Sequence, residues 1–104
     1  MLERRRAPRV KVNLPVRWEG VLTLREAAVT SLSINGCFVL TGGKVDHKEL
    51  IRLEINLPDG RLVYLWSEVV DEAEDIGFAV KFTSVSEEDQ ESLDQFIRLT
   101  LAAS

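Results

Sequence analysis

The stretch IRLEINLPDGRLVYLWSEVV, residues 51–70, decides the fold class. Its first half alternates aliphatic with polar side chains, and the aliphatic positions are Ile51, Leu53, Ile55 and Leu57. An alternation with a period of two is typical of a strand with one buried face. Residues 58–60, Pro-Asp-Gly, are typical of a turn, because proline fixes φ and glycine accepts a positive φ. Residues 62–70 are a second apolar run, so the stretch predicts two consecutive strands joined by a tight turn.

Strand patterns continue on both sides of this pair. Alternating or short apolar runs predict further strands at residues 10–18, 21–29, 37–41 and 76–82. The dipeptide Asn35-Gly36 predicts a hairpin turn within residues 31–36. From Ser86 the apolar spacing becomes helical, which predicts a helix over 86–102 with Ser86 as its N-cap. Six strands followed by one helix predict an all-β fold, a six-stranded antiparallel β-barrel with a C-terminal α-helix over an open end.

Length and composition point to one domain. A chain of 104 residues can bury one modest core but not a second independent one. We expect a single domain over residues 1–104, with a flexible arginine-rich arm at 1–9, the barrel at 10–83 and the helix at 86–102. No run reaches the roughly 18 to 20 apolar residues of a membrane helix. The single cysteine excludes an intramolecular disulfide, so we expect a cytoplasmic protein without membrane insertion.

The net charge of −4 is unevenly distributed along the chain. Residues 1–18 carry +5, since only Glu3 opposes six basic residues: Arg4, Arg5, Arg6, Arg9, Lys11 and Arg17. The rest of the chain carries −9. The basic segment favours an anionic ligand. The acidic remainder would repel an extended polyanion such as duplex DNA, whose binding depends on many phosphate contacts, so a small phosphorylated ligand is expected and a nucleic-acid partner is not.

Residues that could support catalysis or bind a metal are scarce. The one histidine, His47, lies in a polar stretch that favours a surface position. Cys37 follows a turn glycine in a predicted strand, which favours a small buried hydrophobe over a nucleophile. The carboxylates within 71–75 lack the spacing of a calcium loop and are interpreted as a solvated connection. We therefore expect a binding protein and not an enzyme, with no metal and no resident cofactor.

The arginines at the N-terminus carry the strongest functional signal. Guanidinium groups suit bidentate phosphate contacts and stacking on bases. Residues 3–9, ERRRAPR, resemble the RxxxR element of the PilZ domain family. Arg5 and Arg9 fill its two arginine positions, and Arg4 and Arg6 flank them. Residues 31–36, SLSING, are similar to the family's (D/N)xSxxG element, and residues 77–82, GFAVKF, are similar to its glycine-led last strand.

The resemblance implies a bacterial receptor for cyclic di-GMP. In such a receptor Arg5 and Arg9 would contact the phosphates and stack on guanine, with Arg4 and Arg6 in support. The arm would be mobile without ligand, because its arginines repel one another, and would fold against the barrel when the ligand neutralises them. The rearranged surface would then signal to a protein partner.

The second element would bind a guanine edge, with Ser33 as a hydrogen-bonding group and Gly36 allowing a close approach. Its first position holds Ser31, where the family pattern has an acid or an amide. A single short hydroxyl replaces a side chain that accepts two guanine N–H bonds. We expect this change to weaken binding by roughly tenfold to a hundredfold.

Two alternatives stay open. The first is a PilZ-like adaptor that has lost nucleotide binding and contacts other proteins, which the presence of Ser31 favours. The second is a barrel that binds single-stranded nucleic acid. The acidic remainder opposes the second, as do the few aromatics, because Trp18 and Trp66 lie in apolar strand patterns that predict packing in the core or at the barrel ends.

Overall fold

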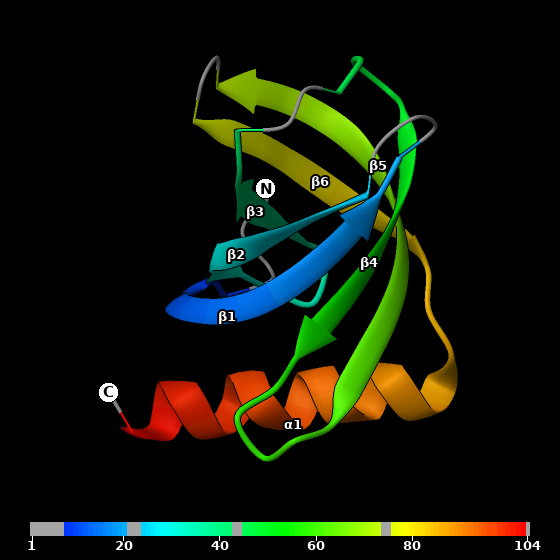
Figure 1. The fold of residues 1–104 in the computed structure, drawn as a ribbon. Helices are drawn as coiled ribbons and strands as arrows, with labels where there is room; N and C mark the ends of the chain where they lie inside the picture. Colours follow the sequence, from blue (N-terminus) through cyan, green and yellow to red (C-terminus); the bar gives the residue numbers. More distant parts are fainter. Residues whose placement is uncertain (1–7, 21–23, 43–44, 74–75, 104) are drawn as a thin grey trace, which may run out of the picture.

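The computed structural model describes residues 8–20, 24–42, 45–73 and 76–103. These residues form six strands followed by one helix (Figure 1). The elements are β1 Val10–Glu19, β2 Leu24–Leu32, β3 Gly36–Leu40, β4 Leu50–Asn56, β5 Leu62–Ala73, β6 Gly77–Ser84 and α1 Glu87–Ala103.

The strands form a closed antiparallel barrel in the order β1-β2-β3-β6-β5-β4. Four of the pairings join strands that follow each other in the sequence. Two further pairings close the ring: β1 with β4, where Trp18 lies opposite Leu53, and β3 with β6, where Val39 lies opposite Phe78. The predicted fold class, a six-stranded antiparallel β-barrel with a C-terminal α-helix, is confirmed.

Alternating side chains of the strands fill the barrel interior. In β4 the three buried residues are Ile51, Leu53 and Ile55, as the sequence predicts. Trp18 of β1 packs edge-on against Phe78 of β6, with ring centroids 5.1 Å apart and an interplanar angle of 85°. Both rings are almost fully buried. This contact joins two strands that each take part in a ring-closing pairing.

The helix α1 begins at a capped N-terminus. The backbone N–H of Asp89 donates to Ser86 Oγ over 3.1 Å, so Ser86 is the N-cap that the sequence predicts. Leu93 and Ile97 are buried in the core, and α1 lies across one end of the barrel next to the β4–β5 hairpin (Figure 1). No helix in the described part of the chain is long and apolar enough to span a membrane.

Polar contacts attach α1 to the β4–β5 hairpin. In the turn of that hairpin, Arg61 Nε donates to the Asp59 carboxylate over 2.7 Å. The same guanidinium donates through Nη1 to Ser92 Oγ of α1 over 3.1 Å. Asp89 of α1 accepts a hydrogen bond from the backbone N–H of Tyr64 in β5 over 3.1 Å. The helix is therefore oriented by charged hydrogen bonds as well as by its apolar face.

The turn after β2 is shorter than the sequence predicts. Its residues are Ser33–Asn35, because β2 extends to Leu32 and β3 begins at Gly36. The expectation that Gly36 belongs to the turn is therefore wrong. A bulge between Val29 and Ser31 shifts the register of β2 against β3, which a strict alternation of residues cannot reveal.

Two expectations for β5 are also wrong. Asp71 and Glu72 belong to the strand itself, past a bulge between Val69 and Asp71, and not to a connection. Trp66 is not a core residue, since 51% of its surface is exposed, whereas Trp18 is 1% exposed as expected. Both faces of β5 carry apolar residues, so periodicity alone does not indicate which face is buried.

Glycines stand at the two ends of the β3–β6 pairing. A Cβ atom on Gly36 would overlap the carbonyl oxygen of Val80, and one on Gly77 would overlap the carbonyl oxygen of Val39. Neither glycine has a positive φ. Both are therefore required by the close approach of two backbones and not by their own backbone conformation.

We predict that Gly77→Ala lowers the free energy of unfolding by about 1–3 kcal/mol, because β3 and β6 must separate to admit the methyl group. Gly42→Ala is the matched control, since no described atom lies within 4 Å of a Cβ at that position. Urea unfolding followed by tryptophan fluorescence measures both changes. Equal stabilities of the two variants would contradict the proposal that Gly77 is required by the close approach of β3 and β6.

Candidate functional site

Arg9 and Ser31 are joined by a hydrogen bond although 22 positions separate them in the sequence. Arg9 Nη1 donates to Ser31 Oγ over 3.1 Å. The β1–β2 register produces this contact, because Val10 lies opposite Leu32 and Lys11 lies opposite Ser31. Antiparallel pairing thus brings the end of the arginine-rich segment and the start of the SLSING segment to one place on the barrel.

Ser33 holds the turn between β2 and β3 in shape. Its Oγ accepts hydrogen bonds from the backbone N–H groups of Asn35, over 3.1 Å, and of Gly36, over 3.3 Å. The hydroxyl also donates to the carbonyl oxygen of Gly36 over 3.4 Å. Ser33 is only 3% exposed. In this structure its hydroxyl is therefore occupied by the protein itself.

The turn is fastened to β6 as well. The carbonyl oxygen of Asn35 accepts a hydrogen bond from the backbone N–H of Phe82 over 2.8 Å. Gly36 lies opposite Lys81 and, having no side chain, lets the strands approach closely. The glycine of the motif thus has a structural role in the β3–β6 pairing, whatever it does toward a ligand.

Three cationic residues lie on the segments next to the turn. Arg9 precedes β1, Lys11 lies on β1 and Lys81 lies on β6, and all three are exposed. Lys81 is not among the residues predicted for the site, although it lies in the quoted strand at 77–82. Only the β3–β6 pairing, which joins distant segments, brings it to the turn. Glu68 of β5 lies opposite Lys81 on the other side and offsets part of the positive potential.

Cys37 lies directly behind this surface and faces the core. It is fully buried, and burial raises the pKa of its thiol to about 12, while the nearby Arg9 charge acts in the opposite direction. The thiol is therefore neutral near neutral pH, and its expected role as a small buried hydrophobe is confirmed.

Among the described residues no group of three or more His, Cys, Asp or Glu side chains is arranged to hold a metal ion. His47 is exposed, as predicted.

The predicted binding residues are only partly covered by the structure. Arg9, Ser31, Ser33 and Gly36 are brought together around one turn. Arg4, Arg5 and Arg6 lie outside the described residues, so their roles stay predictions. The resulting surface combines a guanidinium group, two ammonium groups and a rigid turn, which are the groups needed to contact a small phosphorylated ligand.

A family model, the PilZ domain, matches residues 3–99 of the chain. No curated protein sequence matches it. Among solved structures, the Bacillus subtilis inhibitor of motility MotI/DgrA superposes with a TM-score of 0.83 at 22% identity over 99% of this chain. That match covers 54% of MotI/DgrA, so the chain spans about half the length of that protein.

Two further solved structures contain a bound nucleotide. The PilZ domain of Escherichia coli YcgR with c-di-GMP has a TM-score of 0.76 at 14% identity, over 97% of this chain and 94% of that one. The MrkH–c-di-GMP complex from K. pneumonia has a TM-score of 0.64 at 18% identity, over 98% of this chain and 54% of that one. At these identities the structures establish a shared fold.

We predict that Ser33→Ala lowers the free energy of unfolding by about 1–3 kcal/mol, because the backbone N–H groups of Asn35 and Gly36 lose their acceptor in the turn. Ser31→Ala is the matched control and should stay within about 0.5 kcal/mol, since the partner of its hydroxyl among the described residues is the exposed Arg9 side chain. Chemical denaturation compares the two variants. A larger loss for Ser31→Ala would mean that Ser33 does not organise the turn.

Proposed function

Because this chain belongs to the PilZ domain family, we propose that it binds cyclic di-GMP at the turn of residues 33–35, with Arg9 and the arginines before it. The hydrogen bond between Arg9 and Ser31 is the observation that supports this most directly. It joins the last arginine of the first motif to the first residue of the second. The YcgR and MrkH structures, which share the fold, were solved with this ligand.

The charges of the site suit a ligand with two phosphates. A guanidinium group has five N–H donors, of which Ser31 accepts from one, so Arg9 can also make a bidentate contact to a phosphate. Arg5 lies four residues before Arg9, which in an extended chain spans roughly 13 Å. The two arginines can therefore contact opposite ends of one ligand. Lys11 adds positive charge beside Arg9, and Lys81 adds positive charge on the β6 side of the turn.

In this proposal Ser33 contributes mainly by fixing the shape of the turn. A direct bond from its hydroxyl to a guanine would compete with the bonds to Asn35 and Gly36. The exposed edge of the turn and the Ser31 hydroxyl are then the groups nearest to a bound base. The Ser31 hydroxyl accepts fewer hydrogen bonds from guanine than an acid or an amide would at that position. The affinity for cyclic di-GMP is therefore expected to be reduced but not abolished.

We further propose that ligand binding orders the arm, including Arg4, Arg5 and Arg6, and that the changed surface is recognised by a protein partner. Neutralisation of the clustered guanidinium groups by phosphate supplies the driving force. The protein is proposed to act by binding and not by catalysis, and a cytoplasmic location in a bacterium stays a prediction. An adaptor that no longer binds the nucleotide is the second candidate, and Ser31 in the first position of the motif favours it.

We predict saturable binding of cyclic di-GMP, measured by isothermal titration calorimetry, and no comparable heat with GTP. The double variant Arg5→Ala, Arg9→Ala should lose this binding, because the phosphates lose both charge-assisted contacts. Arg98→Ala, at an exposed arginine on α1, is a charge-removing control away from the turn. If the native chain gives no heat up to about a hundredfold above micromolar ligand, the receptor proposal fails and the adaptor proposal replaces it.

We predict that Ser31→Asp strengthens cyclic di-GMP binding by roughly tenfold, since a carboxylate accepts two N–H bonds from guanine where the hydroxyl accepts one. Ser84→Asp, at an exposed serine on β6 near α1, adds the same charge without touching the turn. The same titration compares both variants with the native chain. Unchanged or weaker binding by Ser31→Asp would place the guanine away from residue 31.

A further inference from the structure

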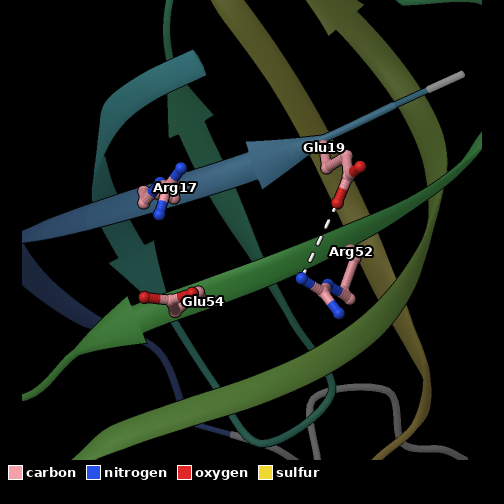
Figure 2. Close-up of a pocket in the computed structure, with 4 residues that line it drawn as sticks. All are labelled: Arg17, Glu19, Arg52 and Glu54. Carbon is pink, nitrogen blue, oxygen red and sulfur yellow. Dashed lines mark ion pairs between the residues drawn. The ribbon is translucent and has the colours of Figure 1, made fainter. Parts of the chain in front are cut away.

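Four charged side chains form a checkerboard on the outer face of β1 and β4. Arg17 and Glu19 lie on β1, and Glu54 and Arg52 lie opposite them on β4. Figure 2 shows the four side chains together on this face. The sign of the charge alternates along each strand and across the pair. The checkerboard has two rows that run across the strands. The row from Arg17 to Glu54 goes from positive to negative, and the row from Glu19 to Arg52 goes from negative to positive.

The adjacent strand β5 extends the two rows with aromatic side chains. Tyr64 lies opposite Glu54, and Trp66 lies opposite Arg52. Their exposed fractions are 45% and 51%, and Leu50 at the start of β4 is 58% exposed. Exposed tryptophan and tyrosine are enriched at protein interfaces, because they bury a large area at low entropic cost. We call this surface the β1–β4–β5 face. It consists of the outward side chains of Arg17, Glu19, Leu50, Arg52, Glu54, Tyr64 and Trp66.

The face has hollows that could accept side chains. A cavity of about 170 Å³ lies among the four charged residues. A second, of about 210 Å³, is lined by Leu50, Arg52 and Trp66 among others, and a third, of about 260 Å³, lies beside Tyr64 and Trp66. Arg52 lines all three hollows, so the hollows are next to one another on the face.

The stability of the isolated chain does not account for this arrangement. Arg52 and Glu19 are 3.7 Å apart, but both side chains are about half exposed, and such surface pairs contribute little. Within the described part of the chain, Arg17 and Glu54 make no ion pair with each other although they face across the strands. The charges and the aromatic pair are thus available to a second molecule.

We propose that this second molecule is another copy of the chain, bound face to face across a twofold axis. The axis runs across β1, β4 and β5, between the two rows. This rotation places every charge of one copy over the opposite charge of the other. The facing pairs are Arg17 with Glu19, Arg52 with Glu54, and Trp66 with Tyr64, each formed twice. Self-complementarity of this kind is what a twofold contact requires and is not needed for an unrelated partner.

The location of the face suits such a dimer. A stable contact buries about 800 Å² per partner, roughly one eighth of the 6433 Å² surface of the described chain. In the barrel order, β4 and β5 lie across the ring from β3 and β2, which carry the turn of the candidate ligand site. Strand β1 is shared, but Arg9 and Lys11 lie at its start, whereas Arg17 and Glu19 lie at its end. The contact would leave that site open in both copies. The proposal therefore goes beyond nucleotide binding and does not depend on it.

Sedimentation velocity of the full chain, from about 1 µM to about 500 µM without ligand, tests the proposal. The native chain should show a concentration-dependent dimer. Arg52→Glu and Glu54→Arg should each weaken dimerisation at least about a hundredfold, because each homodimer would set like charges over each other. An equimolar mixture of the two variants should restore a dimer, since positions 52 and 54 are both acidic in one variant and both basic in the other.

Matched controls are Arg98→Glu and Glu91→Arg, which make the same charge changes at exposed positions of α1 and should dimerise like the native chain. Circular dichroism and thermal unfolding verify that every variant is folded. A native chain that stays monomeric over the whole range overturns the proposal and leaves the face to a different partner. Single variants that still dimerise, or a mixture that does not, overturn it as well.

Discussion

The close approach of the β3 and β6 backbones is the constraint on which the barrel depends. It closes the ring at one of the two places where strands distant in sequence must meet. It is possible because Gly36 and Gly77 carry no Cβ at positions where one would overlap a carbonyl oxygen of the facing strand. The same approach holds the turn at residues 33–35 against β6, through the bond between Asn35 and Phe82. The geometry of the candidate ligand site and the closure of the barrel thus have a common cause.

Most of the fold follows from periodicity. Strands such as β4 alternate buried and exposed residues without interruption, and the change to helical spacing after Ser86 marks α1. Periodicity failed where both faces of a strand carry apolar residues, which led to the wrong expectation that Trp66 packs in the core or at a barrel end, and where bulges shift the register. Register at a bulge is set by pairing with a neighbouring strand, and that information is not local in the sequence.

The candidate site was predictable to a similar degree. The two motifs identified Arg9, Ser31 and the turn, and the β1–β2 register places them in contact. The sequence did not indicate that Lys81 borders the same turn, because a pairing between distant strands brings it there. Nor did the sequence indicate that the Ser33 hydroxyl accepts hydrogen bonds from the backbone N–H groups of the turn. A motif specifies which residue types recur. Which of them faces a ligand and which stabilises the turn depends on the burial of each side chain.

The ring-closing pairings also govern how the chain reaches this structure. Hairpins such as β4–β5 join neighbouring segments and can form within microseconds. Pairing of β1 with β4 and of β3 with β6 requires the closure of long loops, and proteins dominated by such pairings fold in milliseconds to seconds. Since β6 is the last of the six strands to be synthesised, the β3–β6 pairing beside the turn at residues 33–35 is also completed late during synthesis on the ribosome. The nascent chain therefore carries β3 with one edge unpaired until almost the whole barrel sequence has emerged.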